Sequence, residues 1–202
     1  HPSAGHAQDT LVNILLHHVE KLSMGFAEHR PGIVHRLDRN TSGLIILAKS
    51  KKAKEYMQEQ FKSRNVQKTY ITLVIGHLND QEAIINVPLA RSKSHPLKRV
   101  ADPEGKTAQT AYQVLESIGN YDLVEAKPAT GRTHQLRAHF AHLGHPIVGD
   151  KLYGADSFLN LGRYFLHAEK LSFKAPKGVI VNVEAPLPKE LQTVLQKIRS
   201  RV

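Results

Sequence analysis

The sequence contains no cysteine and no long apolar run. Without cysteine the chain has neither a disulfide framework nor a thiolate nucleophile, which suits a reducing compartment. Because no stretch approaches about 18 consecutive apolar residues, we expect no membrane-spanning helix. The first ten residues, HPSAGHAQDT, lack the basic segment followed by an apolar one that marks a secretory signal peptide. These absences together predict a cytoplasmic protein.

Several catalytic motifs are missing as well. The glycine-rich loops GxxxxGK[ST] and GxGxxG are absent, so we expect neither nucleotide hydrolysis nor a dinucleotide cofactor. GxSxG is also absent, which leaves a Ser-His-Asp hydrolase unsupported. Histidines gather in one segment, as His134, His139, His142 and His145, but no HExxH pattern, cysteine or nearby carboxylate completes a ligand set. We interpret them as polar and packing residues and expect no metal.

Positive charge is what the composition has in excess. Lys and Arg number 28 and Asp and Glu 18, which gives a net charge of +10 with neutral histidines. Such a balance favours a polyanionic partner, most often nucleic acid, although a protein can be basic without binding one. The 202 residues fit a single domain with a sizeable core.

The pattern of apolar residues predicts an α+β fold. Helices are expected over 10–18, 51–63, 131–144 and 188–198. Strands are expected over 44–48, 68–76, 108–115, 121–126, 165–173 and 179–183. The polar, basic segment 91–105 is expected to form a loop or hairpin. Antiparallel hairpins therefore outnumber regular βαβ units.

One acid stands out in the stretch VHRLDRNTSGLIILA. Asp38 lies between Arg36 and Arg39, just ahead of the apolar residues 44–48. Nearby positive charge favours the ionised carboxylate, which could act as a nucleophile or a general base. The alternative is a structural salt bridge or a turn-capping acid, and the local sequence alone favours this alternative.

A second basic segment, GRTHQLRAHFAH, offers a partner for this acid. Arg132 and Arg137 are five residues apart, with His134 and Gln135 between them. Arginine can hold a carboxylate or a phosphate through two parallel hydrogen bonds. The segment could therefore pair with Asp38 or bind a phosphate backbone.

A tyrosine in the clearest predicted strand is a further candidate. Tyr70 lies two residues after Lys68, and an aromatic ring near a basic residue can stack on a nucleobase. Most strand tyrosines instead pack in the core or across strands. The strand alone leaves both interpretations open.

Together these segments resemble the RluA-type pseudouridine synthases. HRLDRNTSGLIILAK resembles the family signature HRLDxxTSGhhhhAK, in which h is apolar. KTYITLVIGH, GRTHQLRAHFAHLGHPIVGDKLYG and FLHAEKLSF follow in the family's order, and RPGIVHRLD and HPSAGHAQDTLVNILLHH also fit. The resemblance spans nearly the whole chain and includes the RluC/RluD-like ribosomal RNA branch.

The resemblance implies a mixed, largely antiparallel central sheet flanked by helices and loops, with the active site in a basic cleft. It implies conversion of uridine to pseudouridine in structured RNA, without metal or organic cofactor. A monomer is the default expectation for a small basic enzyme. Large-subunit ribosomal RNA is the first candidate substrate and tRNA the second. The alternatives are a non-catalytic RNA-binding module on the same scaffold, and a hydrolase of the N-glycosidic bond that would release free uracil.

The resemblance also implies roles for individual residues. By position, Asp38 would be the catalytic aspartate and Arg132 the arginine that pairs with it. Tyr70 would pack against the uracil ring and help to remove the C5 proton. Arg36 would enter the RNA stack beside a flipped-out uridine, whose unstacking costs a few kcal/mol. Further RNA contacts are expected from His134, Gln135 and Arg137.

Family members usually carry a short strand ending in a Lys-Pro turn before the HPSxGH segment, and many have an N-terminal S4-type RNA-binding domain. This sequence starts directly on HPSAGH. We therefore expect residues 1–202 to form the catalytic domain without those N-terminal parts.

Overall fold

The computed structural model describes residue 14, residues 32–155 and residues 161–202. The chain divides into two compact units. The first comprises residues 1–36, 45–66 and 173–181, and the second comprises residues 37–44, 67–172 and 182–202. The helix predicted over 10–18 falls outside the described residues, except for residue 14.

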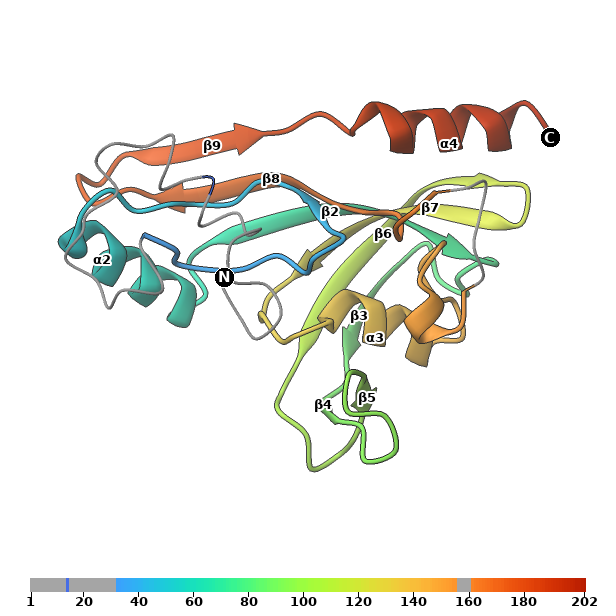
Figure 1. The fold of residues 1–202 in the computed structure, drawn as a ribbon, viewed down its shortest axis with the longest axis horizontal. Coiled ribbons are helices and arrows are strands. Elements are labelled where there is room, and N and C mark those ends of the chain that lie inside the picture. The colour runs from blue at the N-terminus through green and yellow to red at the C-terminus, as the bar shows by residue number, and fades with distance from the viewer. Residues whose placement is uncertain (1–13, 15–31, 156–160) are drawn as a thin grey trace. The chain divides into compact units, whose positions relative to one another are not determined.

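Most residues of the main sheet (Figure 1) belong to the second unit, apart from the end of β8 and the start of β9. Its strand order is β1-β8-β2-β7-β6-β3, with β9 paired to β8. The strands are β1 (Ser42–Gly43), β2 (Gln67–Ile75), β3 (Glu82–Asn86), β6 (Gln109–Ile118), β7 (Tyr121–Pro128), β8 (Leu166–Lys174) and β9 (Ile180–Glu184). β1 runs parallel to β8, whereas β2, β3, β6 and β7 pair antiparallel with their neighbours. The expected α+β class with a mixed, largely antiparallel sheet is confirmed.

Local sequence patterns account for most of these strands. β6 alternates between buried and more exposed residues over its first half, as a strand with one face on the core does. β2 has four consecutive buried residues, 71–74, because it lies in the middle of the sheet. Gly119, with φ of 59°, forms the turn between β6 and β7 with Asn120. The confirmed strand predictions are those over 68–76, 108–115, 121–126, 165–173 and 179–183.

Two helices complete the core of the second unit. α4 (Lys189–Arg199) buries one stripe at helical spacing, Leu191, Val194, Leu195 and Ile198. α3 (Gln135–His142) contributes the fully buried Phe140 to the same cluster. The helix predicted over 188–198 is confirmed. The one predicted over 131–144 is shorter than expected, because it begins only at Gln135.

A small hairpin of β4 (Leu89–Arg91) and β5 (Arg99–Ala101) forms a separate two-stranded sheet. It packs against α3 and extends away from the main sheet (Figure 1). The 3-10 turn η1 (Lys151–Tyr153) also contacts α3. The loop or hairpin predicted over 91–105 is therefore a hairpin.

The first unit contains the amphipathic helix α2 (Lys51–Lys62), as predicted over 51–63. Ser50 caps it by accepting a hydrogen bond of 3.1 Å from the backbone of Ala53. The strand predicted over 44–48 is wrong, since regular pairing stops at Gly43 and Leu47 makes only an isolated bridge. In the part of the chain that the structure describes, no helix is both long and apolar enough to span a bilayer.

Candidate active site

Asp38 lies in the loop that leads into β1, in the second unit. Its backbone carbonyl accepts a hydrogen bond of 2.9 Å from the Thr41 N–H, which closes a tight turn. Its side chain is 16% exposed, and Oδ2 lies 3.5 Å from Nη1 of Arg137 and 3.9 Å from Nε2 of His134. The carboxylate is therefore accessible on one side and faces positive charge on the other.

Arg137 is a buried cation shared between two carboxylates. Its Nε and Nη2 donate to the two oxygens of Asp150 at 2.6 and 2.9 Å, and Asp150 is 1% exposed. Burial disfavours the charged guanidinium, but the hydrogen bonds and charge of Asp150 outweigh it and raise the pKa of Arg137. The two-pronged pair with Asp150 thus fixes the guanidinium that faces Asp38.

Two tyrosine rings hold the guanidinium of Arg137 in place. Its Cζ lies 4.4 Å from the ring centre of Tyr164 and 5.0 Å from that of Tyr153. The Tyr164 hydroxyl lies 3.3 Å from Oγ1 of Thr41, in the turn that Asp38 begins. Burial raises the pKa of both phenols, so both stay protonated near neutral pH.

Side chains of β8 and its preceding loop anchor β1 directly after this turn. Ser42 Oγ accepts from Nη2 of Arg163 at 3.0 Å and lies 2.8 Å from Nδ1 of His167. Because Nε2 of His167 lies 3.0 Å from the Ala185 carbonyl, which can only accept, Nε2 carries the proton and Nδ1 accepts from Ser42. Gly43 has φ of 113°, and a Cβ there would lie 2.1 Å from the Ala168 carbonyl oxygen. The loop that carries Asp38 is therefore held at its far end.

Tyr70 lies on β2 between β7 and β8, next to an irregularity in the β2–β8 register. Burial, followed by the charge of Asp38, raises its pKa to about 12. Its phenol is therefore neutral at physiological pH and lies within electrostatic reach of Asp38. Two residues earlier, Lys68 donates a 3.0 Å hydrogen bond to the Thr130 carbonyl, and burial lowers the Lys68 pKa to about 8.

His134 adopts a left-handed backbone conformation, with φ of 55°, immediately before α3. Its Nδ1 lies 3.3 Å from the Tyr153 hydroxyl, on the opposite side of the ring from the nitrogen that faces Asp38. Burial lowers the pKa of His134, although Asp38 acts in the other direction. The left-handed residue turns the chain so that the imidazole lies beside the carboxylate.

Gln135 is 5% exposed, and its amide is satisfied inside the protein. Its Oε1 accepts from the Arg132 N–H at 3.0 Å and from Oγ1 of Thr130 at 2.6 Å. Its Nε2 donates to the Gln109 carbonyl at 2.9 Å and to Oγ1 of Thr110 at 3.0 Å. The RNA contact predicted for Gln135 does not fit this position, which instead fixes the loop ahead of α3.

Arg132 does not pair with Asp38, which corrects the expectation from the sequence. Its side chain is exposed, and its Nε donates to the Thr107 carbonyl at 3.0 Å. Because α3 starts at Gln135, Arg137 lies inside the helix and reaches the interior, whereas Arg132 stays in the loop. Arg36, the remaining predicted RNA-binding residue, belongs to the first unit and is exposed.

The sequence interpretation missed Asp150, Tyr153 and Tyr164. A lone acid after the apolar Ile147 and Val148 in HPIVGDKLYG was the available indication of a buried charge. Two of the clustered histidines have internal partners: His139 contacts Thr110 and the Val87 carbonyl, and His145 contacts the Ile75 carbonyl. Among the residues that the structure describes, no three His, Asp or Glu side chains come together as metal ligands.

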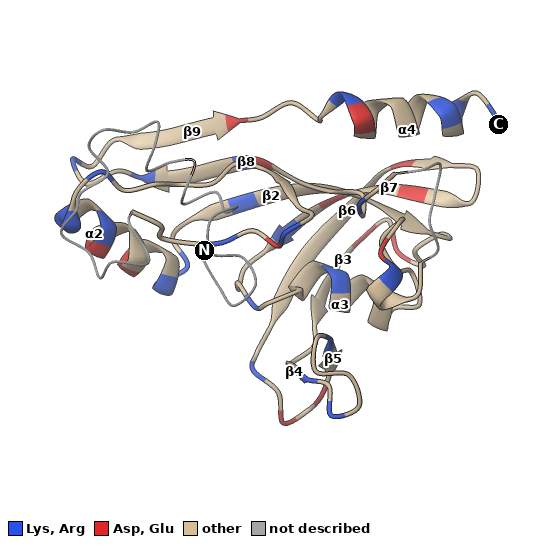
Figure 2. Ribbon diagram, in the orientation of Figure 1, with Lys and Arg blue, Asp and Glu red and all other residues tan. Residues whose placement is uncertain are grey.

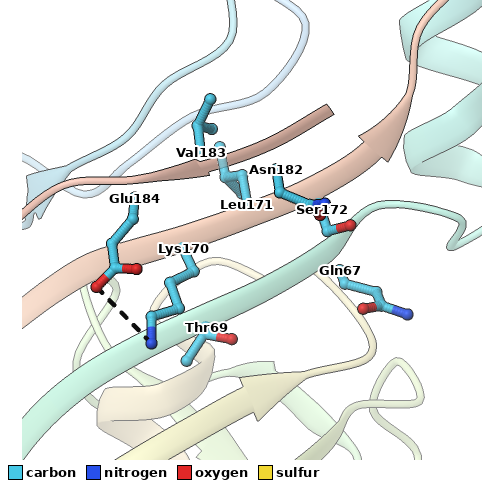
Figure 3. Close-up of a pocket in the computed structure, with 8 residues that line it drawn as sticks. All are labelled: Gln67, Thr69, Lys170, Leu171, Ser172, Asn182, Val183 and Glu184. Carbon is cyan, nitrogen blue, oxygen red and sulfur yellow. Dashed lines mark ion pairs between the residues drawn. The ribbon is translucent and has the colours of Figure 1, made fainter. Parts of the chain in front are cut away.

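A pocket of about 290 Å³ lies elsewhere in the second unit, between β2, β8 and β9 (Figure 3). None of the residues around Asp38 lines it. Its basic side chain, Lys170, pairs with Glu184 at 3.8 Å and with Glu169 at 3.5 Å. This pocket is therefore separate from the residues around Asp38.

Known proteins are similar to this chain in sequence and in fold. The family model described as RNA pseudouridylate synthase matches residues 8–142. An uncharacterized RNA pseudouridine synthase of Chloroflexus aurantiacus is 44% identical over 100% of this chain and 64% of its own length. The ribosomal large subunit pseudouridine synthase D of Nitrosomonas europaea is 38% identical over 99% of this chain and 60% of its own length. The chain thus spans less than two thirds of these two relatives.

A solved structure extends the similarity to three dimensions. The human protein named RNA Pseudouridylate Synthase Domain Containing 1 superposes with a TM-score of 0.74 at 29% identity. The alignment covers 95% of this chain and 85% of the human chain.

Proposed function

The chain belongs to the RNA pseudouridylate synthase family, and we propose that it converts uridine to pseudouridine in structured RNA. In this reaction the N1–C1′ bond breaks, the uracil turns over, and C5 bonds to C1′. The C5 proton leaves to water and N1 regains a proton, so that the product is an isomer of the substrate.

The arrangement of Asp38 carries this proposal. A single carboxylate, 16% exposed, lies on an anchored loop and faces a guanidinium that is itself fixed by Asp150. A carboxylate held in this way is oriented and charge-stabilised before substrate arrives, as a nucleophile at C1′ or a proton acceptor requires. Both roles leave Arg137 as the group that stabilises the charge on Asp38.

Tyr70 fits a packing role against the uracil ring better than a role as base. With a pKa of about 12, its phenolate is a very small fraction at neutral pH, so removal of the C5 proton by Tyr70 would be unfavourable. A neutral phenol can still replace the stacking that a flipped-out base loses. His134 and Arg137 both face the Asp38 carboxylate and complete the proposed site.

Charge near the site supports RNA as the substrate. The β4–β5 hairpin carries Arg91, Lys93, Lys98 and Arg99. Figure 2 shows blue segments, which mark Lys and Arg, on this hairpin. The Arg99 N–H donates to the Tyr153 hydroxyl at 2.9 Å, which connects the hairpin to the tyrosine that packs on the guanidinium beside Asp38. An RNA bound at Asp38 would therefore meet this basic hairpin. We assign a further RNA contact to the exposed Arg36.

We propose large-subunit ribosomal RNA as the substrate, with tRNA second, because the Nitrosomonas relative is named for that activity. We further propose that residues 1–202 act as one catalytic domain, as a monomer in the cytoplasm, with neither metal nor organic cofactor. The net charge of +10 implies RNA binding that weakens as salt rises.

Release of tritium tests the reaction. Large-subunit ribosomal RNA and tRNA, transcribed with uridine labelled at C5, are incubated with the wild-type chain and with Asp38→Ala. We expect tritium in water from the wild type and none from Asp38→Ala. The matched control is Asp80→Ala, which removes an exposed acid of the same unit and is expected to retain the wild-type rate.

The alternative functions give different products. RNA binding without tritium release would identify a non-catalytic binding module, and free uracil in the supernatant would identify a glycosidic hydrolase. Release from Asp38→Ala at the wild-type rate would remove Asp38 from the mechanism.

A further inference from the structure

We propose that Arg132 is a phosphate-binding residue, which together with Lys106 holds the RNA backbone beside the flipped-out uridine. This inference rests on the proposed function, because it takes RNA as the anion. It replaces the role in Asp38 pairing that the sequence suggested for Arg132.

The guanidinium of Arg132 is oriented with its terminal nitrogens available. Nε donates to the Thr107 carbonyl at 3.0 Å, and the side chain is exposed. Among the described residues, no carboxylate forms an ion pair with Arg132, in contrast to Arg137, Arg163 and Arg199. An arginine held at Nε presents its Nη edge outward, the geometry that binds a phosphate through two hydrogen bonds.

The loop that carries Arg132 is rigid before any ligand binds. The Arg132 N–H donates to Oε1 of the buried Gln135 at 3.0 Å. Two residues earlier, the Thr130 carbonyl accepts from Lys68 at 3.0 Å, and Oγ1 of Thr130 accepts from the Gln109 N–H at 3.0 Å. A fixed loop lowers the entropy lost when a phosphate is bound.

The surroundings of Arg132 are open and positively charged. Gly131 is exposed, and a Cβ added there would meet no atom within 4 Å, so internal packing does not require a glycine. A bare backbone permits the close approach of another chain. Lys106 is exposed and precedes Thr107, the residue that accepts from Arg132, and its backbone is held to Leu89 by hydrogen bonds of 2.9 and 3.0 Å. Lys106 therefore adds a second exposed cation next to the residue that holds Arg132.

The position of the loop relates this anion site to the reaction. Arg132 is two residues before His134, whose Nε2 lies 3.9 Å from Oδ2 of Asp38. A phosphate at Arg132 would therefore belong to the nucleotides next to the reacting one. The expected effect of Arg132 is on RNA affinity, whereas Arg137 acts on the charge of Asp38.

Single-turnover tritium release at several salt concentrations separates these effects. The enzyme is in excess over C5-labelled large-subunit ribosomal RNA, and the enzyme concentration at half-maximal rate is measured together with the maximal rate. For Arg132→Gln we expect the half-maximal concentration to rise about tenfold, as for loss of one charge-assisted contact, with a maximal rate within about threefold of wild type. The salt slope of binding, measured by anisotropy of labelled RNA, should fall by about 0.7–0.9.

The matched controls are Lys197→Gln and Arg132→Lys. Lys197→Gln removes an exposed positive charge from α4, in the same unit, and should leave both parameters and the melting temperature near those of wild type. Arg132→Lys keeps the charge and should recover the salt slope but only part of the affinity.

Two results would overturn the inference. The first is a maximal rate for Arg132→Gln that falls about a hundredfold at unchanged half-maximal concentration, which would return Arg132 to a role in catalysis. The second is a salt slope equal to that of Lys197→Gln. Failure of the proposed function is distinguishable, because a wild-type chain that releases no tritium still allows the anisotropy comparison of Arg132→Gln with Lys197→Gln.

Discussion

Replacement of Arg137 by methionine removes the cation that connects Asp38 to Asp150. Met has an unbranched side chain that fills most of the space of the arginine stem and carries no charge. The change leaves the Asp150 carboxylate, 1% exposed, without the two hydrogen bonds of 2.6 and 2.9 Å that stabilise it. It also removes the positive charge 3.5 Å from Asp38.

The expected loss of stability follows from the buried charge. Removing one partner of a buried ion pair costs about 3–5 kcal/mol, which in a chain of this size lowers the melting temperature by roughly 6–20 °C. We expect urea unfolding to show that Arg137→Met has lost about 3–5 kcal/mol of unfolding free energy. We also expect loss of tritium release at temperatures where the variant is still folded, because Asp38 has lost its charge partner.

The double variant Arg137→Met/Asp150→Asn separates folding from catalysis. The amide that replaces the Asp150 carboxylate carries no charge to bury, so the unfolding free energy of the double variant should exceed that of Arg137→Met by at least about 2 kcal/mol. Its tritium release should stay absent. An unfolding free energy of Arg137→Met within about 1 kcal/mol of wild type would refute the argument about the buried pair. Recovery of activity by the double variant would refute the role of Arg137 at Asp38.

Two further predictions concern strands β1 and β2, which carry Gly43 and Lys68 near the site. Gly43→Ala should lower the free energy of unfolding in urea by at least about 3 kcal/mol, because the new Cβ would lie 2.1 Å from the Ala168 carbonyl oxygen at a φ of 113°. A loss below about 1 kcal/mol would contradict this. Lys68→Met tests the lysine pKa of about 8. Between pH 8 and about 10.5, the pKa of lysine in the unfolded chain, Lys68 is protonated in the unfolded chain and neutral in the folded one. The unfolding free energy of wild type should therefore rise by about 3 kcal/mol relative to that of Lys68→Met over this pH range. A difference in unfolding free energy between wild type and Lys68→Met that does not change with pH would contradict the lowered pKa of Lys68.

The elements that the sequence predicted correctly are those specified by neighbouring residues. The β6–β7 hairpin follows from alternation and from Gly119 in its turn. α4 follows from a stripe of buried residues spaced three and four apart, and α2 from its Ser50 cap. In each case the side chains that decide the structure lie within one element, so a local pattern is sufficient.

The errors occur where distant residues decide the structure. Residues 44–48 are apolar enough for a strand, but the observed pairing is between Ser42–Gly43 and a segment more than 120 residues later. That pairing depends on side-chain hydrogen bonds that join Arg163 and His167 to Ser42, which no local pattern contains. A two-residue parallel strand held by such contacts cannot be recognised from periodicity.

The two arginines of GRTHQLRAHFAH show how far local sequence could have decided the site. Both can bind a carboxylate, and the family resemblance assigned the pairing with Asp38 to Arg132, whereas the structure places Arg137 beside Asp38. Their neighbours in the sequence do differ. Arg137 lies between the apolar Leu136 and Ala138, whereas Arg132 lies between Gly131 and a threonine. An arginine flanked by apolar residues inside a helix is the better candidate for a buried ion pair, because its neighbours already place that part of the helix in the core. The sequence around Asp150 indicated a buried charge but not its pairing with Arg137, because Asp150 lies in a separate turn that only the folded chain brings to α3.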